Sequence, residues 1–350
     1  MMVPLFKPYM PAELPELNDI LHSGQLAYGR FAREFEDRLS DFIGIERVIC
    51  TNSFNSAYLV LIKALDLKPG DEVIASPMCC LASSQPFAVS GVKLIWADID
   101  PSTGTLNPDS VRKAVSPATK AILHNHFCGY VGYVGELRSI AKEKGLLLID
   151  DVSEAFGSEY QGLKAGNWGA DATVYSFQTV RLPNAIDGGA LSFKSSEHYK
   201  KAELIRDYGI DRKNFRDNFG EISPLCDISI SAYGCLPSDV NAYIGIESLR
   251  DTPSLIARQR ENSEKVRSTL PDDIHPLSPV TDTLPNYWVF GALADDKQAF
   301  ISKNHSERQQ SVSGVHLPNT FYSLFGKQQG LPGVDEFYSK FIALPCGWWI

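Results

Sequence analysis

Short apolar runs alternate with segments of helical length between residues 72 and 151. The runs read "EVIAS", "KLIWAD", "AILHNHF" and "LLLIDD", and the segments between them place helices near 80–90, 108–115 and 134–144. Runs of this length form strands, and a helix between two strands usually connects parallel neighbours. The sequence therefore predicts an α/β fold: a three-layer, mainly parallel sheet with helices on both faces.

The segments before this region continue the same pattern. Apolar residues recur at helical spacing over 12–22, 30–43 and 54–65, and "RVIC" at 47–50 has the composition of a strand. These elements extend the predicted sheet and its helical layers toward the N-terminus.

The pattern changes after about residue 230. Residues 238–267 have the spacing of a long helix, and the Pro- and Asp-rich stretch 271–285 is expected to be a connector. Two later segments, "NYWVFGALADD" and "FIALPCGWWI", indicate a small α+β unit. We expect a large domain over residues 1–235 and a small C-terminal α+β domain over residues 236–350.

The composition limits the environment and the partners. The chain has 350 residues, a formal net charge of −9 and seven cysteines. An acidic chain is poorly suited to nucleic acid or an anionic membrane, and no apolar run approaches the roughly 20 residues that span a bilayer. An odd number of cysteines without disulfide or zinc spacing fits a reducing compartment. We expect a cytoplasmic protein with no signal peptide, no metal site, no nucleic-acid partner and no membrane contact.

Candidate site residues follow the predicted strands. Ligands of such sheets bind at the carboxyl ends of the strands, which here brings together Asp150–Asp151, His126, the loop 77–80 and the turn 176–181. A buried carboxylate at Asp151 can hold a protonated ring nitrogen, or it can cap the next helix or form an ion pair. His126 is either an acid–base residue or a structural histidine.

Several polar residues near these strand ends suit an anion. Ser176 and Gln178 can donate to a phosphate from the turn that follows a strand. Asn55 and Ser56 lie at the start of the helix 54–65, where backbone N–H groups bind anions, although ordinary helix capping explains them equally well. The basic segment 206–216, with Arg212 and Arg216, can meet a diphosphate or form a solvated surface.

Three cysteines also fall at predicted strand ends. Cys79, Cys80 and Cys128 can act as nucleophiles if their pKa values are lowered, or they can be inert apolar residues.

Longer sequence motifs contain many of these candidate residues in a fixed order along the chain. They read "SGQLAYGRFAREFEDRLSDFIG", "LKPGDEVIASP", "HFCGYVGYVGELRSIAKEKGLLLIDD", "EAFGSEYQG", "YSF" through "GGA" at 175–190, "DVNAYIGIESL" and "LPCGWW". Taken together, the chain resembles the DegT-type sugar-nucleotide aminotransferases, which are pyridoxal phosphate (PLP) enzymes of the aspartate aminotransferase fold. The resemblance implies a homodimer that acts on a nucleotide-linked sugar in surface polysaccharide biosynthesis.

The resemblance assigns some residues to the cofactor. Asp151 matches the aspartate that holds the pyridine nitrogen, and Ser176 matches a phosphate ligand. Glu154 stands where a Gln or His commonly contacts the cofactor. Arg181 falls where the Schiff-base lysine belongs, in a register fixed by Gly188–Gly189. We also expect substrate contacts from Tyr28 and His316.

Other positions depart from the family pattern. The phosphate turn Ser-Gly-Thr reads Ser53-Phe54-Asn55, and Gly234 replaces an asparagine that reaches across the dimer to the phosphate. A guanidinium stays protonated and forms no aldimine, and Phe54 crowds a backbone that must approach a phosphate closely. Binding of PLP or of pyridoxamine phosphate (PMP) is therefore expected to be weakened. Arg181 can instead contact an anionic group of the substrate.

Three hypotheses remain open at this point. In the first, the chain is an enzyme that isomerises, epimerises or dehydrates a nucleotide-linked keto-sugar without an internal aldimine, and Asp150, Glu154, His126 or a cysteine serves as acid or base. In the second, it is a conventional PLP-dependent sugar aminotransferase in which Arg181 is a tolerated or engineered change. In the third, it is a non-catalytic scaffold or partner subunit.

Overall fold

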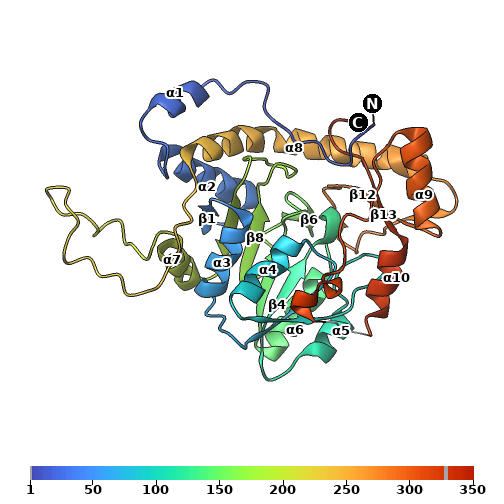
Figure 1. Ribbon diagram of the computed structural model, residues 1–350, viewed down its shortest axis with the longest axis horizontal. Coiled ribbons are helices and arrows are strands. Elements are labelled where there is room, and N and C mark those ends of the chain that lie inside the picture. The colour runs from blue at the N-terminus through green and yellow to red at the C-terminus, as the bar shows by residue number, and fades with distance from the viewer. Residues whose placement is uncertain (1, 327–329) are drawn as a thin grey trace.

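A seven-stranded sheet forms the centre of the computed structural model, which describes residues 2–326 and 330–350 (Figure 1). The strand order is β1-β9-β8-β5-β4-β2-β3, and β9 alone runs antiparallel to its neighbours β1 and β8. The strands are β1 (Val48–Thr51), β2 (Glu72–Ala75), β3 (Lys93–Trp96), β4 (Thr119–Asn125), β5 (Leu147–Asp151), β8 (Ala172–Ser176) and β9 (Gly189–Phe193). Their side chains are mostly buried, because helices cover both faces of the sheet.

Helices pack on the two faces in separate clusters. One face carries α3 (Phe54–Ala64), α4 (Leu81–Val89) and α7 (Ser196–Ile205), whose apolar residues share a cluster with Ile149 of β5. The other face carries α2 (Arg30–Ile43) and α8 (Asp239–Ser268) beside β1, and α5 (Pro108–Ala114) and α6 (Val134–Lys144) beside β4 and β5. Each face of β5 therefore points into a different environment.

The C-terminal part contains a second, antiparallel sheet. Its order is β10 (Ile274–Pro276), β12 (Phe290–Ala294) and β13 (Phe341–Leu344). A third small sheet joins β11 (Thr283–Leu284) to β6 (Glu159–Tyr160) and β7 (Leu163–Lys164). The remaining elements are α1 (Leu17–His22), α9 (Lys297–Lys303), α10 (Pro332–Lys340), the 3-10 turns Phe127–Gly129, Asn319–Phe321 and Ser323–Phe325, and a π-helical turn at Asn304–Arg308.

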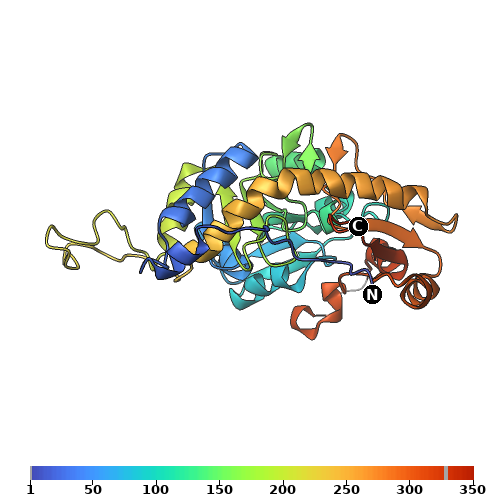
Figure 2. The same cartoon turned by 90° about the horizontal axis from the view of Figure 1, so that it is seen from above.

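One apolar core connects the two sheets. Phe290 and Ile342 of the C-terminal sheet belong to the same buried cluster as Ile49 and Ile149 of the large sheet. The long helix α8 runs along the body of the molecule, and the N-terminal segment lies close to the C-terminus (Figures 1 and 2). The Trp349 indole N–H donates to the Pro4 carbonyl at 3.1 Å. The division of the chain at residue 235 remains a prediction.

Most of the predicted elements are present, and two predictions need correction. The helices predicted at 30–43 and 134–144 have the bounds of α2 and α6. The helix predicted at 12–22 begins only at Leu17. Pro15 has no backbone N–H for a helical hydrogen bond, and its ring would clash with the preceding turn, so the helix begins after it. The connector predicted at 271–285 contains β10 and β11, since short runs between its prolines pair with β12 and β6.

The connection between α7 and α8 projects away from the rest of the chain. Figures 1 and 2 show it as the yellow extension on the left. Phe219 and Leu225 on this segment are 91% and 92% exposed. Among the helices of the described chain, none combines the length and the apolar character needed to cross a membrane.

Candidate active site

Asp151 ends β5 and points to the face covered by α3 and α4. Its Oδ2 accepts hydrogen bonds from the hydroxyls of Tyr58 on α3 and Ser83 on α4, both at 2.6 Å. Its Oδ1 accepts the backbone N–H of Ser153 at 2.9 Å. The carboxylate is 2% exposed, so protein donors replace the water it has lost. We call Asp151, Tyr58 and Ser83 the aspartate corner.

A second group of charged residues lies at the turn that follows β5. Glu154 Oε1 contacts His316 Nε2 at 2.7 Å and Arg181 Nη2 at 3.4 Å, and Glu154 Oε2 accepts the Cys128 backbone N–H at 2.7 Å. Burial alone would raise the pKa of Glu154, but His316, Arg181 and the Cys128 amide outweigh it and lower that pKa to about 2. We call Glu154, Arg181 and His316 the arginine corner.

The Arg181 guanidinium is enclosed but incompletely paired. Its side chain is 6% exposed and lies 4.1 Å from the centroid of the Trp288 ring, which stacks in turn on Phe6. Its Nε and Nη1 groups have no hydrogen-bond partner among the described residues. A buried N–H group without a partner is costly, so these two donors are suited to a ligand acceptor.

The nearby cysteines are thiols rather than thiolates. Burial raises the pKa values of Cys79, Cys80 and Cys128, and the negative charge of Glu154 raises them further. Cys79 is also held by the Asn319 amide, whose Nδ2 lies 3.2 Å from its sulfur. A role as a thiolate nucleophile is not supported by these surroundings.

Comparison with known proteins identifies the group to which this chain is related. Residues 10–347 match the DegT/DnrJ/EryC1/StrS aminotransferase family. The chain belongs to this family. A dTDP-4-dehydro-2,3,6-trideoxy-D-glucose 4-aminotransferase of Saccharopolyspora spinosa is 28% identical over 359 residues, which cover 98% of this chain and 91% of that relative.

Solved structures of the same kind superpose on the whole chain. The crystal structure of AtS13 from Actinomadura melliaura gives a TM-score of 0.92 at 29% identity and covers 100% of this chain and 95% of that one. DesI, solved in the presence of its TDP-sugar product, gives a TM-score of 0.87 at 26% identity and covers 100% and 88%. The predicted α/β fold and family are thereby confirmed.

The residues at the start of α3 that are predicted to bind a phosphate lie in other surroundings. The Ser53 hydroxyl accepts the Ser56 backbone N–H at 3.1 Å and thus caps α3, while Asn55 is exposed. The Phe54 side chain is 2% exposed and packs edge-on against the Tyr58 ring. The start of α3 is therefore anchored in the apolar core.

The turn after β8 is close to the start of the same helix. Ser176 is buried and Gln178 is half-buried, and the Gln178 carbonyl accepts the Arg181 backbone N–H at 2.8 Å. A Cβ at Gly189 would lie 2.8 Å from the Ser53 carbonyl oxygen, so only glycine allows β9 this close to α3. Ser176, which pairs with Gly189 across the sheet, thus lies close to Ser53 at the start of α3.

Other predicted substrate residues are not brought to the crevice of a single chain. Arg212 pairs with Asp207 through two 2.5 Å hydrogen bonds, and Arg216 donates to the Gly220 carbonyl within the projecting segment. The Tyr28 hydroxyl donates to Glu36 at 2.9 Å, in a group that also contains Arg206.

The position of Gly234 is filled by a neighbouring ring. A Cβ at Gly234 would collide with the Tyr208 hydroxyl, which therefore takes the space next to this glycine.

His126 lies on the opposite face of the sheet from Asp151. Its Nδ1 accepts the Gly132 N–H at 3.1 Å, so its proton is on Nε2, which is 3.4 Å from Asp150 Oδ1. His124 Nδ1 lies 3.5 Å from the same oxygen, and all three side chains are fully buried. Of the two predicted roles for His126, these contacts favour the structural one.

These three residues form a group that the sequence spacing did not indicate. The ligand atoms of His124, His126 and Asp150 lie within 4.8 Å of one another, close enough to hold a metal ion. Burial lowers the pKa of His124 to about 4, and the two rings outweigh the effect of burial on Asp150 and lower its pKa to about 2. A proton on His126 Nε2 is not compatible with metal coordination through that atom, so we assign the group as two rings facing one carboxylate.

Sequence reasoning missed three residues of the site. Tyr58 lies one helical turn after Phe54, on the α3 face that meets Asp151, and Ser83 lies in the apolar start of α4. Trp288 comes from the segment before β12, about a hundred residues after Arg181. The alternation of β5 predicts that Asp150 and Asp151 face opposite sides, but no sequence pattern indicates which distant side chains meet them.

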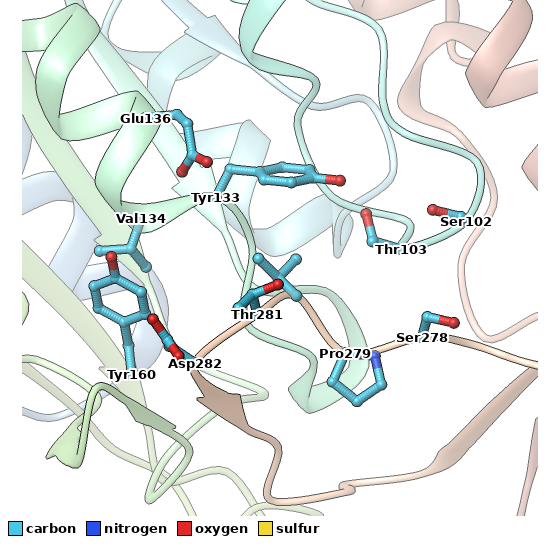
Figure 3. Close-up of a pocket in the computed structure, with 11 residues that line it drawn as sticks. Ser102, Thr103, Tyr133, Val134, Glu136, Tyr160, Ser278, Pro279, Thr281 and Asp282 are labelled. Carbon is cyan, nitrogen blue, oxygen red and sulfur yellow. The ribbon is translucent and has the colours of Figure 1, made fainter.

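A separate surface cleft of about 370 Å³ lies between α6 and the loop before β11 (Figure 3). Its lining includes Ser102, Thr103, Tyr133, Tyr160 and Asp282, and it contains none of the predicted site residues. The Tyr133 hydroxyl donates to Asp100 at 2.5 Å, so this hydroxyl is already paired. The cleft is therefore separate from the aspartate and arginine corners.

Proposed function

We propose that this member of the family binds and acts on a nucleotide-linked keto-sugar without a PLP internal aldimine. The observation that carries the proposal is Arg181, which replaces the Schiff-base lysine according to the sequence register and lies buried beside Glu154. The buried polar and charged residues of the described chain include no lysine. A guanidinium does not form the aldimine, so chemistry at this position has to be of another kind.

The residues present do not fit PLP as this family is expected to hold it. Asp151 is retained, but its Oδ2 already accepts two hydroxyls, from Tyr58 and Ser83. Phe54 is anchored in the core where the family pattern has glycine, and the Ser53 hydroxyl caps its own helix. The groups expected to meet the pyridine nitrogen and the phosphate are thus already hydrogen-bonded or packed within this chain, and Arg181 replaces the amine that would meet the aldehyde.

The substrate class is taken from the relatives. The Saccharopolyspora spinosa relative is named for a dTDP-linked 4-dehydro sugar, and a Helicobacter pylori relative at 26% identity over 94% of this chain is a transaminase named for a UDP-linked amino sugar. We infer that this chain takes a sugar of the same kind, linked to a pyrimidine nucleoside diphosphate, in the biosynthesis of a surface polysaccharide.

We also propose that the chain is a homodimer. Phe219, Ile222 and Leu225 expose apolar side chains on the segment that projects from the body of the chain, and such groups are typical of protein contacts. In a dimer this segment can bring Arg212 and Arg216 to the diphosphate in the partner's crevice. Light scattering should give twice the mass of the chain, and Leu225→Asp should shift it toward the monomer; a monomeric wild type would contradict the proposal.

The test of the function is ligand binding without added PLP. Calorimetric titration with a dTDP-linked 4-keto-sugar and with its UDP-linked counterpart should give saturable binding to at least one of them. Free dTDP and UDP serve as controls. A sugar nucleotide that binds more tightly than its free nucleotide shows that the sugar itself contacts the protein. Absence of binding to every sugar nucleotide would leave the scaffold hypothesis in place, and transfer of an amino group with added PLP would restore the conventional aminotransferase.

A further inference from the structure

We propose that the arginine corner catalyses enolisation of the bound keto-sugar: Arg181 donates to the carbonyl oxygen, and His316, oriented by Glu154, moves the proton of the adjacent carbon. This inference rests on the proposed function, because it requires that a keto-sugar binds. The reaction at the bound sugar is left open by the family relationship and the fold, and the proposal specifies it.

Arg181 supplies donors that nothing in the described chain uses. The guanidinium is fixed by its Nη2 contact with Glu154 and by the Trp288 ring, while Nε and Nη1 are buried without an acceptor. Two fixed N–H groups in an enclosed site are suited to an oxygen on which negative charge develops. A sugar carbonyl is such an oxygen, because it becomes an enolate oxygen when the neighbouring carbon loses a proton.

Carbonyl chemistry suits this site better than the capture of a phosphate. Beyond the effect of burial, the carboxylates of Glu154 and Asp151 both raise the pKa of the Cys80 thiol and Arg181 lowers it, so these charges lie near one another, and Glu154 is ionised. A dianionic phosphate would add two further negative charges to an enclosed site that already holds acidic groups around one guanidinium. A neutral carbonyl oxygen accepts from Arg181 without that repulsion.

His316 has the arrangement of an oriented base. Its Nε2 lies 2.7 Å from Glu154 Oε1, so with an ionised Glu154 the ring proton is held on Nε2 and the lone pair is on Nδ1. No hydrogen bond to Nδ1 is formed within the described residues. A carboxylate that holds one imidazole nitrogen also stabilises the imidazolium formed when the other nitrogen takes a proton.

The two groups can act on neighbouring atoms of one ligand. Arg181 and His316 contact the same oxygen of Glu154, so the two side chains converge on one carboxylate. His316 also lines a groove of about 430 Å³ with Gly314, Leu317 and Tyr338, and its side chain is 14% exposed against 6% for Arg181. A proton on His316 can therefore exchange with solvent.

The step balances without any further reactant. His316 Nδ1 takes the proton from the carbon beside the carbonyl, and the electron pair of that C–H bond forms the C=C bond of the enolate. The π pair of the carbonyl moves to oxygen, where the Arg181 N–H groups face it. Return of a proton from the imidazolium to carbon restores the ketone, and an imidazolium that has exchanged with solvent returns a solvent hydrogen.

The experiment is hydrogen exchange in heavy water. The wild-type protein is incubated without PLP with a dTDP-linked 4-keto-sugar or its UDP-linked counterpart, and deuterium at the carbons next to the carbonyl is followed by NMR and mass spectrometry. Wild type should accelerate exchange clearly over a protein-free control. His316→Gln should slow it by a factor on the order of 10²–10⁴ while the sugar nucleotide still binds.

Two further variants separate catalysis from structure. His275→Gln changes an exposed histidine on β10 and should leave the exchange rate unchanged. Glu154→Asp keeps a carboxylate and should retain more of the exchange rate at saturating ligand than Glu154→Gln does. A charge with a purely structural role does not predict this difference in rate.

The outcomes distinguish the two proposals. A sugar nucleotide that binds but shows no exchange above the protein-free rate overturns the enolisation and leaves the proposed binding function intact. Exchange that is unchanged in His316→Gln overturns the assignment of the base. Failure of any sugar nucleotide to bind overturns the proposed function itself.

Discussion

The aspartate corner and the arginine corner differ in how completely their charged groups are hydrogen-bonded. At the aspartate corner, Asp151 accepts three donors from its own chain, and none of its oxygens depends on a ligand. At the arginine corner, Arg181 is also buried but has two N–H groups without a partner among the described residues. The first arrangement stabilises the fold, and the second is available for binding.

This difference predicts that substitutions of paired and of unpaired groups have different consequences, also within the arginine corner. Changes to groups that are already paired should lower stability and leave ligand binding to the intact fold unaffected. Changes to groups that lack partners should affect binding and barely affect stability. The substitutions below test that separation.

The largest effect on stability is expected for Glu154→Gln. The substitution removes the charge that faces Arg181 and His316 and leaves a guanidinium buried without an ion pair. We expect a loss of about 3–5 kcal/mol in the free energy of unfolding, measured by urea titration at pH 7. Glu159→Gln is the matched control, because the Glu159 carboxylate pairs with Arg260 at a half-exposed position and should cost less than about 1 kcal/mol. Equal losses in the two variants would contradict the account.

The same carboxylate should make stability depend on pH. Because the pKa of Glu154 is lower in the folded than in the unfolded chain, its contribution is complete above pH about 4.5 and is lost as the pH falls toward about 2. The difference in free energy of unfolding between wild type and Glu154→Gln should therefore shrink by about 3 kcal/mol over this range. A difference that does not change with pH would show that the charge of Glu154 is not stabilising.

A smaller loss is expected at the aspartate corner for Tyr58→Phe. The variant keeps the ring in the core and removes one of the two hydroxyl donors to Asp151 Oδ2. We expect a loss of about 1–3 kcal/mol in the free energy of unfolding, with unchanged affinity for the sugar nucleotide. Tyr208→Phe, at a ring that is 62% exposed, is the control and should be close to neutral. A fall in affinity with little change in stability would reverse the assignment of this corner.

The smallest effect on stability is expected for Arg181→Met. The methionine keeps an apolar contact with Trp288, and removal of two unpaired buried N–H groups offsets the lost ion pair, so stability should change by less than about 1 kcal/mol. Affinity for the keto-sugar nucleotide should nevertheless fall by a factor of about 10–100, as expected for hydrogen bonds from a charged group. A large loss of stability with full affinity would mean that Arg181 is a structural residue.

The sequence indicates the fold and one side of the site well. Apolar runs and their spacing predict β2, β4, β5 and the helices around them, because burial on both faces of a parallel sheet leaves a strong pattern. The strand-end rule also predicts that Asp151, Ser176 and Arg181 lie at the same edge of the sheet.

The remainder depends on contacts between distant segments. Tyr58 and Ser83 reach Asp151 only after two helices have packed on the same face, and a tyrosine at helical spacing is indistinguishable in the sequence from an ordinary core residue. The position of His126 after a strand is compatible with an acid–base or a structural role, and only the contact of its ring with Asp150 favours the structural one. Arg212 and Arg216 lie on a segment whose direction no local pattern specifies.

The most direct test of the central claim is the reaction of the purified chain with PLP. Visible absorbance is followed during titration, the mixture is reduced with borohydride, and the mass of the intact chain is measured. We predict no saturable absorbance change and no stoichiometric gain of a phosphopyridoxyl group, because Arg181 offers no amine and the aspartate corner is closed by Tyr58 and Ser83. A saturable band that reduction fixes to one lysine would contradict this account and make the chain a conventional aminotransferase.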